Sequence, residues 1–496
     1  MSDYIIGANA LESLTEALYK TSWSIFREYI QNSCDSIDNA VRENIFTNRD
    51  QGCINIFIDK DSRNIKIEDN AAGVKADDFT RLLGSIAASE KNKDVDKGFR
   101  GIGRLCGLAC CKTLTFSAKF KGEQVISRLT CDAALMRELT SSTEKLTADE
   151  VLKQIYKFSQ DFTDDIDGHY FIAELEGISD EHSYLLDVDG VKNYLAFVAP
   201  LPYPENFAPF ISQIHEHAEE LGLRIDVYKI FLNNEQLFKP YKHEFTTSNG
   251  EDSIKSIKFI DLRDKDNNLF AWMWYGLSSF KAVIKESCKM RSIRLRKENI
   301  QIGDEDTLQN LFPEEKAIHY FAGELFCVSN VLIPNTSREY LKENSARAAF
   351  ESAMKNIFMK LSGIYKKAAA IRSSLKKISD SEKIIEENQY RLDEGLYHDD
   401  ERKQQLEDEI INAKSDIEKY NAAIEKCKSH SEIMREVAEY IEQEPAQEAT
   451  VNDKPLSVSG KRLLRKVFGV ILDEFGTGDY TKKLIETIKE KLNFNK

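Results

Sequence analysis

Near residue 360 the spacing of apolar residues becomes continuously helical, and that change restricts the fold more than any other feature. From about 360 to 443 there is no proline, and apolar residues recur at alternating intervals of four and three, the heptad pattern of packed helices. The most regular seam consists of Leu406, Ile410, Ala413, Ile417, Tyr420, Ile424 and Cys427. Because the segment 393–400 lacks this period and contains Gly395, we expect the chain to reverse there into an antiparallel helical hairpin.

Upstream of the hairpin, stretches with helical and with strand-like spacing alternate, as they do in α/β domains. A helical pattern over 22–42 precedes strand-like segments at 53–59, 64–68, 112–120 and 170–175. Further strand-like segments lie at 224–228, 256–261, 270–276, 292–295 and 324–332. Because one hydrophobic core rarely supports 496 residues, we expect several domains.

The expected order of domains follows from these patterns. We predict an α/β sandwich at 1–185 and a second α/β domain at 186–358. A helical coiled-coil hairpin at 359–443, a polar linker at 444–456 and a small helical module at 457–496 should follow. The hairpin has three open uses: packing within the chain, a dimer contact or an arm that contacts a partner.

Composition excludes some classes of protein. The chain is 42% hydrophobic and 30% charged, and it lacks both an apolar run long enough for a membrane span and a signal-peptide pattern. Its nine cysteines show no zinc-binding spacing, which favours reduced thiols in a cytoplasmic protein. A net charge of −15 disfavours general affinity for nucleic acid, although it does not exclude a local basic stripe.

Three segments contain candidate functional residues. Within the first predicted helix, Glu28, Asn32 and Asp35 are spaced i, i+4 and i+7, so they project from one face. Taken alone, such a polar stripe is usually a solvated helix surface.

The second segment follows a predicted strand, where Asp69 is followed four residues later by Gly73. A carboxylate at a strand end accepts hydrogen bonds, and glycine allows a planar ligand to approach the backbone. The third segment, 97–104, contains Gly98, Gly101 and Gly103, whose backbone N–H groups suit a polyphosphate. Each segment is weak by itself, since turns and flexible loops use the same residues.

Together and in this order, the three segments resemble the nucleotide pocket of the GHKL ATPases with the Bergerat fold, among them DNA gyrase, heat-shock protein 90, histidine kinases and MutL. The segment 83–89, Leu-Gly-Ser-Ile-Ala-Ala-Ser, is similar to the lid of the heat-shock protein 90 chaperones. The segment 332–339, Leu-Ile-Pro-Asn-Thr-Ser-Arg-Glu, resembles the catalytic loop of their middle domain. The resemblance covers about 1–350, and the family's usual C-terminal dimerisation domain is not apparent.

This resemblance implies a role for each residue of the pocket. Glu28 would be the general base that activates water, and Asn32 would complete the shell of Mg²⁺. Asp69 would accept a hydrogen bond from the adenine amino group of ATP. Asp35 would support the pocket, and Gly73 would leave room for the base.

The resemblance also implies moving parts. A lid over about 74–104 would close so that Gly98, Gly101 and Gly103 wrap the phosphates. In the second domain, Arg338 of the loop 332–342 would reach the γ-phosphate when the domains dock, with Asn335 positioning it. Hydrolysis would then be slow and gated by a conformational step.

The chain departs from the family pattern at four places. His169 replaces a common threonine, Leu82 replaces an asparagine of the lid helix, and Lys342 replaces a glutamine after the catalytic arginine. Arg104 stands where a phenylalanine closes the glycine-rich motif, and it offers an extra phosphate contact. These changes affect the details of nucleotide contacts and rate.

Three functions remain under consideration. The leading one is an ATP-dependent clamp resembling heat-shock protein 90, which acts on a protein client or partner and forms a homodimer through its helical region. The alternatives are a nucleic-acid clamp like MutL or the microrchidia ATPases, in DNA maintenance or prokaryotic defence, and a nucleotide-gated scaffold with negligible hydrolysis. A histidine kinase is disfavoured, because no phospho-acceptor helix precedes the ATP-binding segment.

Overall fold

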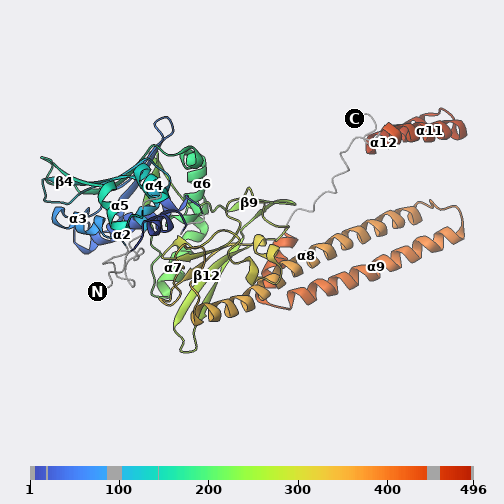
Figure 1. Cartoon of the computed structure of the whole chain (residues 1–496). Coiled ribbons are helices and arrows are strands. Elements are labelled where there is room, and N and C mark those ends of the chain that lie inside the picture. The colour runs from blue at the N-terminus through green and yellow to red at the C-terminus, as the bar shows by residue number, and fades with distance from the viewer. Residues whose placement is uncertain (1–5, 18–20, 87–102, 143–144, 444–457, 493–496) are drawn as a thin grey trace. The chain divides into compact units, whose positions relative to one another are not determined.

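The computed structural model describes residues 6–17, 21–86, 103–142, 145–443 and 458–492 (Figure 1). The chain divides into two compact units, Met1–Ile441 and Glu442–Lys496. Among the helices described, none is both long and apolar enough to cross a membrane.

The first part of the larger unit is built on an eight-stranded sheet of order β5-β4-β3-β6-β2-β1-β7-β8. Its strands are β1 (Cys53–Asp59), β2 (Asn64–Asp69), β3 (Thr113–Lys119), β4 (Val125–Asp132), β5 (Tyr156–Phe162), β6 (Tyr170–Glu176), β7 (Lys229–Leu232) and β8 (Glu235–Gln236). The strands predicted at 53–59, 64–68, 112–120 and 170–175 are confirmed as β1, β2, β3 and β6. Neighbours pair antiparallel except β1 and β7, which are parallel.

Helices form a second layer on this sheet, so the predicted α/β sandwich is confirmed (Figure 1). They are α1 (Asn9–Glu12), α2 (Ser24–Arg42), α3 (Ala76–Gly84), α4 (Ala133–Ser141), α5 (Ala148–Ile155) and α6 (Val188–Val198). On α2, Phe26, Ile30 and Ile37 are buried in the same core as Ile54 and Ile56 of β1. That apolar face leaves the opposite side of α2 for polar residues.

The first sheet extends beyond the predicted boundary at 185. After α7 (Ala208–Glu220), β7 returns to pair with β1, and the first core includes Leu195, Leu232 and Leu237. The strand expected at 224–228 in the second domain is therefore found at Lys229–Leu232 in the first sheet. Pairing between segments so distant in sequence leaves no signal in local periodicity.

The second part contains a five-stranded sheet of order β11-β12-β15-β13-β14 and the two-stranded β9–β10 sheet. Their strands are β9 (Glu244–Thr247), β10 (Gly250–Ser253), β11 (Ser256–Arg263), β12 (Leu269–Leu277), β13 (Ser292–Lys297), β14 (Ile300–Gln301) and β15 (Ala322–Cys327). Trp272 and Trp274 of β12 share a core with α7, whereas Met273 and Tyr275 share the other core with α8. This sheet is therefore covered on both faces.

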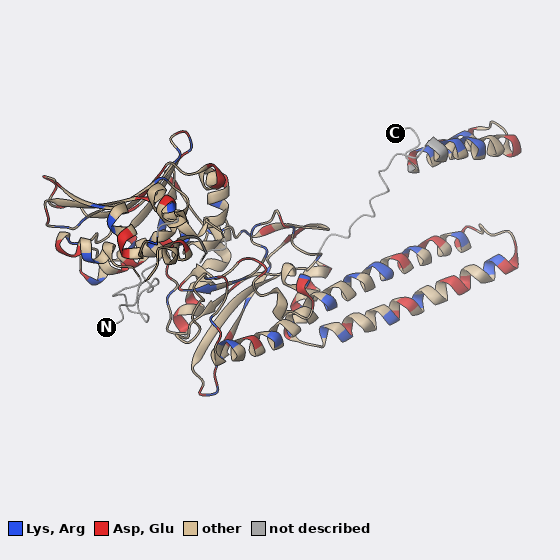
Figure 2. Cartoon of the chain, in the orientation of Figure 1, with Lys and Arg blue, Asp and Glu red and all other residues tan. Residues whose placement is uncertain are grey.

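The predicted helical hairpin is present, formed by α8 (Ser345–Asp393) and α9 (Asp400–Lys428), with α10 (Glu432–Glu442) following (Figure 1). The first helix begins at Ser345, earlier than the expected 359, because its first turns pack on the second sheet through Phe350 and Phe358. Leu406 and Ile410 of the predicted seam are buried. Acidic and basic residues are interspersed along both helices of the hairpin (Figure 2).

The smaller unit contains the predicted C-terminal module, a pair of helices, α11 (Val458–Phe475) and α12 (Asp479–Lys491). Phe468 and Ile485 are buried between them. The predicted linker at 444–456 lies outside the described residues.

Candidate functional site

The helix α2 presents the three predicted residues as one group. The Glu28 side chain is 15% exposed and lies 3.6 Å from Arg27, measured from Arg27 Nε to Glu28 Oε1. Asn32 is half-buried, and Asp35 is buried. A Cβ atom on Gly103 would lie only 2.2 Å from Glu28 Oε2, so the end of the predicted lid passes directly against the Glu28 carboxylate. A larger residue at this position would require the Glu28 carboxylate to move.

The carboxylate of Asp69, at the end of β2, is buried, and its two oxygens differ in their hydrogen bonding to the described residues. It is 2% exposed, and its Oδ1 accepts a hydrogen bond of 3.1 Å from the backbone N–H of Ala71. Its Oδ2 is buried and has no hydrogen-bond partner among the residues that the structure describes. Burial raises the pKa of Asp69 to about 7, although the nearby hydroxyls of Ser33 and Ser36 oppose the shift. A buried acceptor of this kind is costly unless a ligand supplies a donor.

The segment after Asp69 is held by backbone geometry. Gly73 has φ +70°, and a Cβ atom there would lie 2.0 Å from the Lys119 carbonyl oxygen of β3. Glycine is thus required where the segment crosses β3, a reason separate from the expected room for a base. Just before β6, Nδ1 of His169 lies 2.7 Å from the Ala71 carbonyl oxygen. His169, which replaces a threonine of the family pattern, therefore contacts this same segment.

Part of the predicted lid cannot be placed. Gly98 and Gly101 lie in the segment 87–102, outside the described residues, so their contact with phosphates stays a prediction. Gly103 is described, and it contacts Glu28 as stated above.

Arg104 is directed away from the role expected of it. Its guanidinium donates a hydrogen bond to the carbonyl oxygen of Ser85, at the end of α3. Burial lowers the pKa of Arg104, with Tyr156 and Cys131 nearby, and the Tyr29 hydroxyl donates to its carbonyl oxygen at 2.9 Å. In this arrangement Arg104 links the end of the lid to α2 and α3, and a phosphate contact by its side chain stays a prediction that this placement does not support.

The loop 332–342 is organised by Asn335. Its Oδ1 accepts a hydrogen bond of 3.0 Å from the Glu339 backbone N–H, and its own N–H donates to the Tyr340 carbonyl oxygen at 2.8 Å. Arg338, at the tip, has φ +55°, a strained backbone conformation for a residue with a side chain. Its carbonyl oxygen accepts a hydrogen bond of 2.8 Å from the Gly303 N–H, and this bond helps to hold the strained conformation.

The structure brings this loop against α2. Arg27 Nη2 donates a hydrogen bond of 2.9 Å to the Ser337 carbonyl oxygen, across 310 residues of sequence. Arg338 is 8% exposed; its burial lowers the pKa of the guanidinium, while the carboxylates of Glu28 and Asp35 raise it. Arg338 therefore lies in the electrostatic field of the predicted general base.

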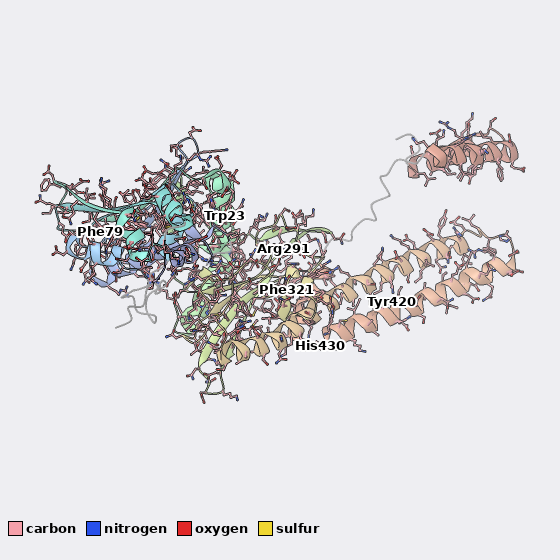
Figure 3. All side chains as sticks on the ribbon, viewed as in Figure 1. Trp23, Phe79, Arg291, Phe321, Tyr420 and His430 are labelled. Carbon is pink, nitrogen blue, oxygen red and sulfur yellow. The ribbon has the colours of Figure 1, made fainter. Side chains whose placement is uncertain are left out.

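Two residues at this junction were missed by the motif analysis, Arg27 and Tyr194 of α6. Burial raises the pKa of Tyr194 to about 12, and Arg27 and Glu28 are among its charged neighbours. Trp23, which precedes α2 and is labelled in Figure 3, stacks on Tyr194 with ring centroids 5.5 Å apart. The position of Arg27 directly before Glu28 was a usable signal in the sequence, whereas nothing there marked Tyr194.

Asn32 offers an amide oxygen of the kind that a magnesium nucleotide takes from a protein. Within the described ranges there is no group of three or more His, Cys, Asp or Glu side chains that would hold a metal ion. Mg²⁺ commonly takes one or two protein oxygens and fills its shell with phosphates and water. The amide oxygen of Asn32 fits that limited role. Of the other departures, Leu82 packs against the first core and Lys342 is exposed.

The residues singled out by their motifs thus lie on the α/β sandwich and on a loop of the second part that contacts α2. Residues 19–161 match the family model described as histidine kinase-, DNA gyrase B- and HSP90-like ATPase. The resemblance of the first part of the chain to the GHKL ATPases, predicted from its motifs, is therefore confirmed. The chain is also similar to the chaperone protein HtpG of Mycolicibacterium gilvum (strain PYR-GCK), with 32% identity over 85 residues. That match covers 16% of this chain and only 13% of the chaperone.

Proposed function

We propose that this protein is an ATP-dependent conformational clamp resembling heat-shock protein 90, which hydrolyses ATP slowly and closes on a protein client or partner. The observation that most supports the proposal is the contact between α2 and the loop 332–342, where Arg27 bonds to Ser337 and Arg338 lies near Glu28. A general base and a cation from different domains then act on one phosphate.

Binding of ATP depends first on Asp69. Its buried Oδ2 accepts a hydrogen bond from the adenine amino group, which removes the cost of leaving that oxygen without a donor. Guanine presents a carbonyl at the same position, so the carboxylate favours adenine. His169 contacts the neighbouring segment and stands where it can adjust the fit of the base.

Hydrolysis depends on Glu28 and Arg338. Glu28 orients a water molecule and accepts its proton, while Arg338 stabilises the negative charge that develops as the phosphoryl group leaves. Mg²⁺, held in part by Asn32, would neutralise phosphate charge. Asn335 positions Arg338 by closing the loop around it.

Turnover is gated because the site requires two domains. Arg338 contributes only while its loop contacts α2, so any motion that separates them lowers the rate. Arg27 links the two by bonding to the loop while lying beside Glu28.

The smaller unit offers a surface for self-association. Leu463, Val467 and Val470 of α11 are 65%, 42% and 60% exposed and are spaced i, i+4 and i+7, so they form one apolar stripe. Basic residues at 461–466 precede the stripe's centre and the acidic pair 473–474 follows it. Two copies of α11 packed antiparallel would match stripe to stripe and basic to acidic ends, which supports a homodimer.

The test is ATP hydrolysis by the full chain and by Glu28→Ala, each alone, with a denatured protein and with duplex DNA. Hydrolysis that needs Glu28 and rises with denatured protein supports the proposal. Strong stimulation by DNA alone would replace it with a nucleic-acid clamp. Tight ATP binding with no hydrolysis above Glu28→Ala would replace it with a nucleotide-gated scaffold.

A further inference from the structure

The turn between β13 and β14 has an unusual backbone. It consists of two residues, Glu298 and Asn299, with φ of +53° and +58°. Positive φ at both positions is the geometry of a type I′ turn, which asparagine and glycine adopt most readily. Asn299 is 2% exposed, so this strained turn is buried rather than placed at a loop tip in solvent. Buried strain of this kind persists only where the surroundings hold it.

On one side, Asn299 is bonded to a buried cluster of charges in the second domain. Its Oδ1 accepts a hydrogen bond of 2.8 Å from Lys239 Nζ, and its carbonyl oxygen accepts one of 2.8 Å from Arg296 Nη1. Both cations also bind Glu324 of β15, and all three charged side chains have 0% exposure. The second domain therefore fixes Asn299 from two directions.

On the other side, Asn299 is bonded to the first domain. Its Nδ2 donates a hydrogen bond of 2.6 Å to the carbonyl oxygen of Asp226. The Asp226 carboxylate binds Arg49, which also donates to Asp38 of α2 at 2.5 Å. Tyr228 donates to the same Asp38 carboxylate at 2.9 Å. A continuous polar network thus joins the sheet of the second domain to the helix that holds Glu28.

The same hairpin supports Arg338. Glu298, the other residue of the turn, is among the carboxylates that raise the pKa of Arg338. Gly303, just beyond β14, donates to the Arg338 carbonyl oxygen at 2.8 Å. One short segment, 298–303, therefore contacts both the anchor of α2 and the loop with Arg338.

We propose that Asn299 is a positioning residue for ATP hydrolysis, which sets the spacing between Glu28 on α2 and Arg338 on its loop. Asn299 touches neither the nucleotide nor the reacting atoms; it holds the edge of the second sheet against the segment that anchors α2. This inference rests on the function proposed above. Misplacement by about 1 Å costs up to a hundredfold in rate, so the loss of one such link is measurable.

The informative variant is Asn299→Gly in the full chain. Glycine adopts positive φ without strain and keeps the carbonyl oxygen that Arg296 binds, so the turn folds while both side-chain bonds are lost. Asn267→Gly is the matched control, since Asn267 also has a positive φ, of +64°, but is exposed in the turn between β11 and β12.

For Asn299→Gly we expect kcat to fall about tenfold with the Kd for ATP unchanged, because positioning affects the transition state more than binding. Adding Arg338→Ala should lower the rate no further than Arg338→Ala alone, because both changes remove the same contribution. Additive losses, or an unchanged kcat, would overturn the inference. Asn267→Gly should behave as the unaltered protein.

A second readout does not require hydrolysis. Amide hydrogen exchange in the segment 332–342 should become several-fold faster in Asn299→Gly and stay unchanged in Asn267→Gly, because the loop separates from α2 more often. Unchanged exchange would overturn the inference even if the protein proved to be no ATPase. Absence of hydrolysis in the unaltered protein would count against the proposed function only, and the exchange rates would still decide the role of Asn299.

Discussion

Replacement of Asp69 by asparagine should stabilise the ligand-free protein and abolish ATP binding. The cause is the buried carboxylate, whose Oδ2 has no donor among the described residues and whose pKa is raised to about 7 by burial. In the unfolded chain the pKa returns to its ordinary value of 3.8. The folded state therefore binds the Asp69 proton more tightly than the unfolded chain does. The stability that the protonated carboxyl contributes is fully present below about pH 4 and is lost as the pH rises through 7.

The magnitude follows from that change in pKa. A pKa raised from 3.8 to about 7 corresponds to about 4 kcal/mol of stability lost at pH 8. Asparagine avoids this cost because it stays neutral, but its buried amide lacks a partner, which costs about 1–3 kcal/mol. We therefore expect Asp69→Asn to be more stable than the unaltered protein by about 1–3 kcal/mol at pH 8, with little or no gain at pH 5.

The assay is thermal or urea unfolding between pH 5 and pH 8, together with an equilibrium titration of ATP. Asp59→Asn is the matched control, because Asp59 ends β1 in solvent and its pKa is lowered by the Ser62 hydroxyl. At no pH should Asp59→Asn be more stable than the unaltered protein, and it should bind ATP normally. An Asp69→Asn protein no more stable at pH 8 than the unaltered one would refute the burial argument, and normal ATP affinity would refute the adenine contact.

Three further predictions concern packing and assembly. Gly73→Ala should lower the melting temperature far more than Gly122→Ala, since both glycines have positive φ but only Gly73 has a carbonyl oxygen 2.0 Å from the added Cβ. Thermal unfolding followed by circular dichroism would measure both melting temperatures, and equal decreases would contradict the geometry. Glu324→Gln should cost about 3–5 kcal/mol in urea unfolding, because the Arg296 guanidinium would stay buried without its carboxylate partner. Val467→Asp should convert the expected dimer to a monomer in analytical ultracentrifugation, whereas an unchanged mass would place the interface elsewhere.

The sequence predicted those parts of the site that depend on local spacing. Glu28, Asn32 and Asp35 share a helix, so their common face followed from the helical period alone. Asp69 followed in the same way from its place at a strand end. The loop 332–342 was identified by resemblance, and its folded form then explained why Asn335 accompanies Arg338.

Long-range pairing could not be predicted in this way. The bond from Arg27 to Ser337 spans 310 residues, and β7 joins the first sheet only after α6 and α7 have passed. Asn299 had no motif, because its role depends on a turn conformation and on partners from three separate segments. Arg104 was interpreted from its place in a motif, yet its side chain donates to the carbonyl oxygen of Ser85, a contact that the motif does not indicate.

In the function proposed above, Arg338 completes the Glu28 site from a second domain. The most direct test of this role is the single-turnover rate of ATP hydrolysis in Arg338→Ala, with bound ATP measured in the same samples and Arg263→Ala, an exposed arginine at the end of β11, as control. We predict a rate at least about a hundredfold lower for Arg338→Ala at unchanged ATP affinity, and no change for the control. Hydrolysis by Arg338→Ala at the unaltered rate would contradict the account.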